Sequence, residues 1–344
     1  MITNARVLQA DWVPREIVHR NPEKNLLQTA LQPVADGGRP EDALITGPSG
    51  AGKTCLARYS LQQIEEERLD IHTKHVDCWA ASKPFRVLLE LLDPVAPTHD
   101  IHRTTARDTM LSRLRDVDAP YLAVLDEADQ LGDPGLLGEL YSIPKLTLVL
   151  VTNDEQSLSG LFDERLRSRF RSGVHVHCDS YSLDTLVSIL DRRARGALEP
   201  GAVERPQLER IADAAAGDAR RAISILRRAA RRAMDDEAGV IDGSHITPAI
   251  PEAAREQRQA DLERLNDHQR AVYAVLANAD GGAAPKAVYE EYTQRVSSPK
   301  TKRTVRDYLG KLQSYNLATA TGEGPARRYH VVEIDSPEAE PAAE

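Results

Sequence analysis

Residues 47–54 read Gly-Pro-Ser-Gly-Ala-Gly-Lys-Thr, a glycine-rich loop that ends in Lys53 and Thr54. The short apolar run 43–46 precedes the loop and a helix-like segment follows it, which is the setting of a phosphate-binding loop. Glycines let such a backbone wrap round phosphates, so that N–H groups and the helix N-terminus face them. The stretch therefore predicts a nucleotide site, with the lysine on the β- and γ-phosphates and the threonine hydroxyl on Mg²⁺.

Two later strand ends carry polar side chains that we expect beside this loop. The apolar run 121–125 ends in Asp126 and Glu127, and the run 146–151 is followed by Asn153. Because the carboxyl ends of parallel strands meet at one edge of a sheet, Asp126 is expected to hold the metal through water. Glu127 would polarise the attacking water, and Asn153 would face the γ-phosphate. Alone, each would more often be a solvated turn, but the loop upstream favours the functional interpretation.

The sequence pattern changes twice along the chain. Short apolar runs alternate with helix-like segments up to about residue 182, which predicts a parallel α/β sheet. Helical spacing alone follows, and the last part combines helix-like segments with two short strands, 317–320 and 329–332, as in a winged helix. The expected strands of the sheet are 43–46, 75–78, 121–125, 146–151 and 174–176. The expected domains are a nucleotide-binding α/β domain at 1–182, a helical lid at 183–263, a winged helix at 264–335 and a disordered acidic tail at 336–344.

Composition and charge set limits on the kind of protein. The 344 residues have a formal charge of −9, yet residues 295–328 contain eight Lys and Arg against two Asp and Glu. Only nine of the 44 basic residues are lysine, which favours a GC-rich genome and a high-salt cytoplasm, where an acidic total says little about DNA binding. The N-terminus lacks a signal-peptide pattern, no apolar run is long enough for a bilayer, and the three cysteines are scattered. We expect a cytoplasmic protein with no membrane partner, no disulfide frame and no zinc site.

Several motifs together resemble the archaeal Orc1/Cdc6 replication initiators, which are AAA+ ATPases, and the composition favours a haloarchaeal member. The phosphate-binding loop and the two polar strand ends are the first of these motifs. The resemblance covers almost the whole chain. Its further motifs are residues 7–14 together with 19–20, Val-Asp-Cys-Trp at 76–79, Leu-Asp-Glu-Ala-Asp-Gln-Leu at 125–131, Arg-Leu-Arg-Ser-Arg-Phe at 165–170, Gly-Asp-Ala-Arg-Arg-Ala at 217–222, and, in the winged helix, residues 265–270 together with 322–329. It implies an α/β AAA+ P-loop sheet domain with a helical lid and a C-terminal winged helix.

The resemblance also implies which residues serve the nucleotide. ATP or ADP, with Mg²⁺, would be held by Val13, Pro14, Gly47, Pro48, Ser49, Gly50, Ala51, Gly52, Lys53, Thr54, Cys55, Asp126 and Arg220, of which Thr54 and Asp126 serve the metal. Catalysis would use Glu127, Asn153, Arg220 leaning from the lid, and Arg169 acting in trans on the ATP of a neighbouring subunit. Arg165 is the second candidate for the trans role. Four arginines within residues 165–171 are also what a solvated basic helix carries.

The winged-helix resemblance implies a DNA-binding surface on the basic stretch. A helix from about 299 to 314 would enter the major groove of origin DNA, and the tip of the wing would touch the adjacent backbone or minor groove. The implied contacts are Lys300, Lys302, Arg303, Arg306, Arg327 and Arg328. Other initiator subunits and the replicative helicase are further expected partners. A protein-binding winged helix with a basic solvated face is the alternative interpretation.

The chain departs from the family in the segment 84–117, where initiators carry an extra helical element. Two helix-like stretches, 85–89 and 105–114, indicate a reduced insertion whose DNA contacts have no residue assignment. The chain is also short for the family, which leaves a divergent paralogue as an interpretation. Two other functions remain open: another AAA+ DNA machine, such as a clamp loader or Holliday-junction motor, and a non-catalytic winged-helix regulator that holds ADP. The DNA sequence that is bound cannot be inferred, because base contacts depend on docked geometry.

Overall fold

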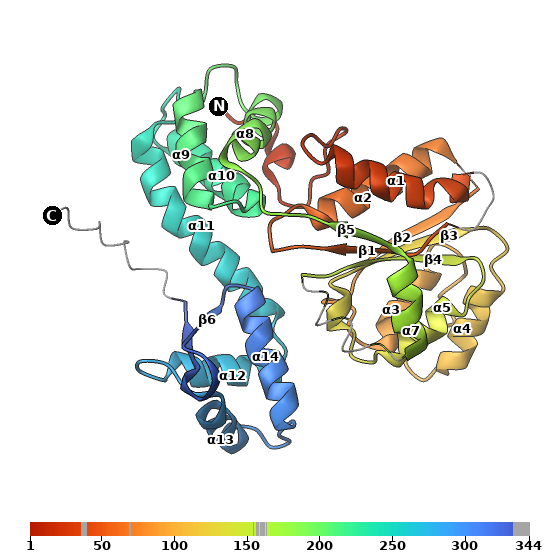
Figure 1. Cartoon of the computed structure of the whole chain (residues 1–344). Helices are drawn as coiled ribbons and strands as arrows, with labels where there is room; N and C mark the ends of the chain where they lie inside the picture. Colours follow the sequence, from red (N-terminus) through yellow and green to blue (C-terminus); the bar gives the residue numbers. More distant parts are fainter. Residues whose placement is uncertain are drawn as a thin grey trace. The chain divides into compact units, whose positions relative to one another are not determined.

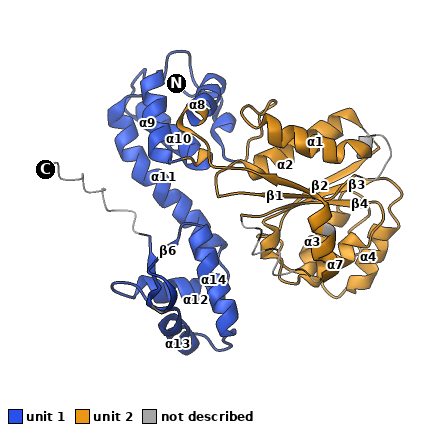
Figure 2. Cartoon of the chain, viewed as in Figure 1, with its two compact units in different colours: residues 1–10, 186–216, 220–344 blue, residues 11–185, 217–219 orange. Residues whose placement is uncertain are grey.

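The computed structural model describes residues 1–35, 40–68, 70–153, 155, 158, 162 and 164–332, without the side chains of residues 34, 35, 169 and 325. The chain divides into two compact units (Figure 2): unit 1 contains residues 1–10, 186–216 and 220–344, and unit 2 contains residues 11–185 and 217–219. The expected tail, 336–344, lies outside the described residues. The domain boundaries drawn from the sequence stay a prediction. No helix in the described ranges is both long and apolar enough to cross a membrane.

Unit 2 is built on a five-stranded sheet in the order β2-β3-β4-β1-β5, and every pairing is parallel. Its strands are β1 (Ala43–Thr46), β2 (His72–Asp77), β3 (Tyr121–Asp126), β4 (Leu146–Val151) and β5 (Val174–His177). All five expected strands are present. Strand β2 begins three residues earlier than expected, because its polar first half still pairs with β3 although it lies at the edge of the sheet. An apolar-run criterion misses such a half-exposed strand.

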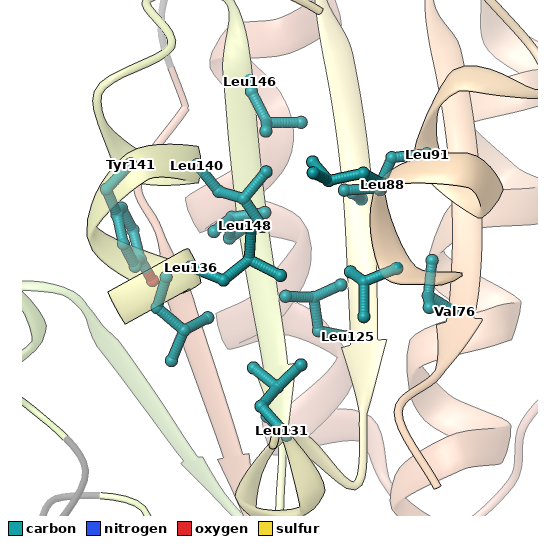
Figure 3. Packing of buried hydrophobic residues seen from close by; sticks show 14 of the residues in the cluster. Val76, Leu88, Leu91, Leu125, Leu131, Leu136, Leu140, Tyr141, Leu146 and Leu148 are labelled. Carbon is teal, nitrogen blue, oxygen red and sulfur yellow. The ribbon is translucent and has the colours of Figure 1, made fainter. Parts of the chain in front are cut away.

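Helices cover both faces of this sheet (Figure 1), because successive strand residues point to opposite sides. Leu122 and Val124 join one apolar cluster, whereas Ala123 and Leu125 join the other. The first cluster includes residues of α1 (Asn21–Ala35) and α2 (Lys53–Glu67). The second includes residues of α3 (Pro84–Leu92), α4 (Arg107–Arg115), α5 (Gly135–Tyr141) and α7 (Glu164–Ser172), and Figure 3 shows part of it. The predicted fold class is therefore confirmed for the α/β unit.

Unit 1 contains the predicted helical segments. They are α8 (Leu183–Ala197), α9 (Arg205–Ala215), α10 (Ala219–Asp235) and α11 (Gly243–Arg264). The first turn of α8 and the first residue of α10 belong to unit 2. The N-terminal residues, with the short 3-10 helix η1 (Ala5–Leu8), belong to this unit: the Thr3 N–H donates to the Ala197 carbonyl at 2.8 Å, and Arg193 donates to the Val7 carbonyl at 2.6 Å.

Charged side chains join α10 to α11 in a cluster that we call the arginine ladder, formed by Arg227, Arg228, Arg232, Glu252 and Glu256. Glu256 accepts hydrogen bonds from Arg227 at 2.6 Å and Arg228 at 3.2 Å, and Glu252 accepts from Arg228 at 3.2 Å and from Arg232. The hydrogen-bonded arginines hold the pKa of Glu252 below its usual value. Burial alone would raise the pKa of Glu256, but its arginine partners lower that pKa by more, so it also lies below its usual value. Sequence alone gave these arginines no specific role.

The C-terminal part of unit 1 has the order of elements expected of a winged helix. Its elements are α12 (Asp267–Ala277), α13 (Pro285–Arg295), α14 (Lys302–Ser314), β6 (Ala318–Thr321), the short 3-10 helix η3 (Gly324–Ala326) and β7 (Arg328–Val331). Strands β6 and β7 pair antiparallel, and an isolated bridge joins Ala283 to Tyr329. The expectation that the basic helix starts near residue 299 is wrong: α14 begins at Lys302, because the Thr301 side chain caps it by accepting from the Thr304 N–H. Lys300 therefore precedes the helix.

Candidate nucleotide site and basic surface

The loop 47–54 follows β1 and ends where α2 begins, at Lys53. Gly47 and Gly52 have φ of 140° and 85°, a region that side chains rarely adopt. A Cβ at Gly47 would collide with the Cys178 carbonyl, and one at Gly52 would collide with the Tyr181 hydroxyl. The backbone thus forms a tight cradle at the N-terminus of a fifteen-residue helix, which fits the phosphates of a nucleotide.

Lys53 is almost fully buried and is held at both sides of its ammonium group. Its Nζ donates to the Pro48 carbonyl at 2.7 Å and to Oδ1 of Asn153 at 2.8 Å. Asn153 follows β4, the neighbour of β1, so the parallel order of the sheet brings it to the loop as predicted. The structure thus brings together two of the residues that the sequence singled out.

Asp126 is the last residue of β3 and is only 5% exposed. Burial alone would raise its pKa, but hydrogen bonds from His75 and Thr54 and the nearby charge of Lys53 bring that pKa below its usual value. The carboxylate is therefore ionised at neutral pH and lies beside the Thr54 hydroxyl. Carboxylate and hydroxyl oxygens are the donors that Mg²⁺ prefers, so the pair fits that ion.

Glu127 directly follows this strand in the left-handed conformation, with φ of 52° and ψ of 46°. Such a backbone is uncommon for residues other than glycine and often occurs at functional sites. The Glu127 N–H donates to Oδ1 of Asp126 at 3.1 Å. The sharp turn thus brings the Glu127 backbone against the Asp126 carboxylate at the carboxyl end of β3.

Three polar contacts around this edge were missed by sequence reasoning. Nε2 of His75 lies 3.1 Å from Oδ2 of Asp126, across the β2–β3 pair. The hydroxyl of Thr152, a fully buried residue, donates to Oδ1 of Asp129 at 2.9 Å and so ties the ends of β3 and β4 together. Arg58 completes the set from α2, 3.4 Å from Nδ1 of His75. No pattern in the sequence marks these contacts, because the register that places His75 opposite Val124 is set by the pairing of the two strands.

The start of the Gly-Asp-Ala-Arg motif also reaches the loop, because residues 217–219 belong to unit 2. The Ala219 N–H donates to the Gly50 carbonyl at 3.2 Å, and a Cβ at Gly50 would collide with the Asp218 carboxylate. Gly217 accepts from the Tyr181 N–H at 3.1 Å. Arg220 is the next residue along the chain, half-buried in unit 1, and its approach to the phosphates stays a prediction.

The N-terminal segment, which resembles the part of Orc1/Cdc6 initiators that contacts adenine, contributes Arg20 to the loop. The guanidinium group donates to the Ala51 carbonyl at 3.1 Å and lies 4.3 Å from the ring centroid of Tyr181. Val13 and Pro14 are half-buried, and Val13 packs against the apolar cluster behind the loop. Their contact with adenine stays a prediction.

The remaining members of the predicted nucleotide set, Ser49 and Cys55, are half-buried in and just after the loop.

Burial raises the pKa of the Cys178 thiol to about 11 and that of the Cys78 thiol well above its usual value. Both cysteines are therefore inert thiols in the core, as expected from their places at the ends of apolar runs.

The predicted arginine-finger segment forms α7, which buries Leu166 and Phe170 against the sheet. Arg165 is exposed, and Arg167 donates to the Phe162 carbonyl at 3.0 Å. Arg169 lies within α7, but its side chain is outside the described atoms, so its trans role stays a prediction.

The inner side of the segment 84–117, the reduced insertion, packs against the sheet. Helices α3 and α4 bury Leu88, Leu91 and Leu111 in the cluster under the sheet. Arg107 of α4 donates to Asp133 at 2.5 Å and to Glu139 at 2.6 Å. The predicted pair of helices is thus present, and its outer side has no assigned partner.

The six basic residues predicted to meet DNA are all exposed. They are Lys300 and Lys302, Arg303 and Arg306, and Arg327 and Arg328. The opposite face of α14 is anchored by Val305, Leu309 and Leu312, which are buried. The guanidinium groups of the wing arginines hydrogen-bond to neighbouring residues: Arg327 donates to Gln313 at 3.3 Å and Arg328 to the Gly282 carbonyl at 3.2 Å.

Comparison with known proteins agrees with this geometry. Residues 42–162 match the family described as an AAA domain, and residues 187–251 match the Cdc6 AAA+ ATPase-type lid domain. ORC1-type DNA replication protein 9 of Halobacterium salinarum is 41% identical over 339 residues, which are 98% of this chain and 96% of that protein. The chain belongs to the ORC1-type DNA replication protein family.

Other relatives agree with this family assignment. ORC1-type DNA replication protein 1 of the same organism is 40% identical over 309 residues, 89% of this chain and 100% of that protein. The solved structure of the Aeropyrum pernix ORC1 protein in complex with DNA is 25% identical and has a TM-score of 0.74, covering 96% of this chain and 93% of that chain. The resemblance to Orc1/Cdc6 initiators is thereby confirmed. This ORC1-type chain is an AAA+ ATPase of DNA replication initiation.

Proposed function

We propose that this ORC1-type protein is a nucleotide-switched initiator that binds the DNA of a replication origin. The observation that carries the proposal is the hydrogen bond from the Ala219 N–H to the Gly50 carbonyl of the phosphate loop. Ala219 is the first residue of α10, so a change in the loop on nucleotide binding acts on the start of that helix. A ligand shifts such an equilibrium only through different contacts in the two states, and Arg220 is our candidate for that difference.

The nucleotide part of the proposal assigns one role to each group. Lys53 neutralises the β- and γ-phosphates, Glu127 accepts the proton of the attacking water, and Asn153 orients that water against the γ-phosphate. Thr54 and Asp126 hold Mg²⁺. When bound, this ion would supply positive charge that neutralises the phosphate oxygens. Because Lys53 and Asn153 already share a hydrogen bond, the γ-phosphate is read by two side chains at once.

The proposed DNA surface consists of α14 and the β6–β7 hairpin. The exposed residues Lys302, Arg303 and Arg306 lie on the solvent side of a helix whose other face is anchored, as a recognition helix requires. Lys300, which precedes the helix, and the wing residues Arg327 and Arg328 serve as phosphate contacts. The proposal also includes assembly with further initiator copies, in which Arg169 acts in trans. It further includes recruitment of the replicative helicase and action in the cytoplasm.

Footprinting of the purified protein tests this function. The experiment uses DNA flanking its own gene, in high salt, with ATP present. Protection of a repeated, inverted element supports the initiator, and a variant in which Lys302, Arg303 and Arg306 are replaced by Gln should lose that protection. Absence of specific protection in the flanking DNA would overturn origin binding at that locus.

A further inference from the structure

His75 is the only described side chain of the edge strand β2 that hydrogen-bonds to Asp126. In the parallel register His75 lies opposite Val124, two residues before Asp126. Its Nε2 nevertheless reaches Oδ2 of Asp126 at 3.1 Å, and the two side chains are 14% and 8% exposed. A hydrogen bond between two largely buried side chains holds both in one rotamer.

The partner of the other ring nitrogen defines which nitrogen of His75 carries the proton. Nδ1 lies 3.4 Å from a terminal nitrogen of Arg58. A guanidinium group can only donate, so Nδ1 must accept, and the proton of the neutral ring is on Nε2. Nε2 therefore donates to Asp126, which as a carboxylate can only accept. All three groups have complementary donors and acceptors.

Arg58 lies four residues after Thr54 on α2, so the two side chains share one face of that helix. The helix that begins at the phosphate loop thus contacts Asp126 by two routes. Thr54 hydrogen-bonds to the carboxylate directly, and Arg58 acts on it through His75. The carboxylate is oriented from β2 and from α2 at the same time.

We propose that His75, oriented by Arg58, is a positioning residue for Mg²⁺: it fixes the Asp126 carboxylate in the rotamer in which its remaining lone pairs face Thr54. The inference rests on the metal role proposed for Thr54 and Asp126. Groups that hydrogen-bond to a metal-binding carboxylate commonly change metal affinity by about 10- to 100-fold when they are removed. A residue that only braced the sheet would change stability without changing the effect of Mg²⁺.

The test compares ADP affinity in excess Mg²⁺ and in EDTA. His75→Phe keeps a ring but removes both nitrogens, whereas His75→Gln retains an N–H donor. His72→Phe is the matched control, since His72 lies on the same strand and its ring meets Tyr121 edge-on, at 6.2 Å between ring centroids. We expect His75→Phe to lose about tenfold in affinity with Mg²⁺ and less than about twofold in EDTA. His75→Gln and His72→Phe should behave like the wild type.

The outcomes separate this inference from the function on which it rests. If wild-type affinity does not respond to Mg²⁺, the metal role of Asp126 fails and the inference fails with it. If the wild type responds and His75→Phe responds equally, the inference alone is overturned. An equal loss with and without Mg²⁺ also overturns it, because a bracing role predicts that result.

A measurement on the wild type does not depend on any variant folding. Nitrogen NMR of the histidine rings at alkaline pH should show His75 as the neutral tautomer with its proton on Nε2. A proton on Nδ1 would overturn the arrangement. Arg58→Met should release the ring, giving a mixture of tautomers and a smaller, about threefold, loss of Mg²⁺-supported affinity; unchanged values in that variant would also contradict the proposal.

Discussion

Two lysines show how differently the two ends of this chain handle negative charge. Lys53 is 7% exposed and hydrogen-bonds to a backbone carbonyl and to Asn153. Lys302 lies on the open face of α14, with the ring of Tyr289 at 5.4 Å from its ammonium group. The first lysine is buried and held by two hydrogen bonds, and the second is exposed to solvent.

The difference predicts two kinds of response to mutation. In the loop the side chains hydrogen-bond to one another and to the backbone. Removal of one side chain therefore leaves others buried without partners, and the loss of nucleotide affinity or turnover is large. On the basic surface each charge contributes separately through release of counterions, so losses are graded and depend on salt.

The largest effect is expected for Glu127→Gln. The amide cannot accept the proton of the attacking water, and a general base contributes about 100- to 10,000-fold to a rate. Steady-state ATP turnover should fall by about 1,000-fold, whereas ATP affinity should remain near the wild-type value. Turnover within tenfold of the wild type would exclude Glu127 as the base. A regulator that only holds ADP would keep its full function in this variant, whereas an initiator that cycles ATP would be trapped in one state.

Lys53→Ala should abolish high-affinity nucleotide binding. The variant removes the positive charge of the cradle and leaves Asn153 without its donor, so ADP affinity should fall by about 100-fold in a fluorescence titration. Lys302→Ala is the reciprocal control and should bind ADP normally. An affinity within threefold of the wild type in Lys53→Ala would show that the loop is not preorganised around this lysine.

Replacement of Lys302 and Arg303 together by Ala should weaken DNA binding without affecting nucleotide affinity. Each lost phosphate contact lowers the slope of log K against log salt by about one, so two should weaken binding by about tenfold or more at moderate salt. The control is Lys286→Ala on α13, an exposed lysine outside the proposed surface. If the control and the double variant behave alike, α14 is not the DNA-binding helix.

The smallest effect concerns the arginine ladder, where charges in unit 1 are fixed as they are in the loop. Glu256→Ala should lower the free energy of unfolding by about 1 kcal/mol, and Glu209→Ala, from an exposed pair on α9, by less than about half of that. The lowered pKa of Glu256 means that its contribution is present above the ordinary glutamate pKa and is lost as pH falls through the lowered one. Urea titrations at pH 7 and pH 3 should therefore show the difference between wild type and variant shrinking at the lower pH.

The sequence was sufficient for features whose chemistry is local. The glycines of 47–54, Lys53, and the polar residues after two apolar runs could be placed because parallel strands end at one edge. His75 could not be placed, since β2 has a polar first half and its register with β3 is set by pairing rather than by pattern. The arginine ladder was equally hidden, because it depends on which faces of α10 and α11 meet. The start of α14 was misjudged because the Thr301 cap delays the helix to Lys302.

In the proposed function, the nucleotide in the loop sets the affinity of unit 1 for DNA. The most direct test measures binding of one origin duplex with saturating ADP and with a non-hydrolysable ATP analogue, at fixed salt. The account predicts that the two affinities differ by at least about fivefold, the lower end of usual coupling between sites, and that Lys53→Ala removes the difference. Equal affinities with both nucleotides in the wild type would contradict the account.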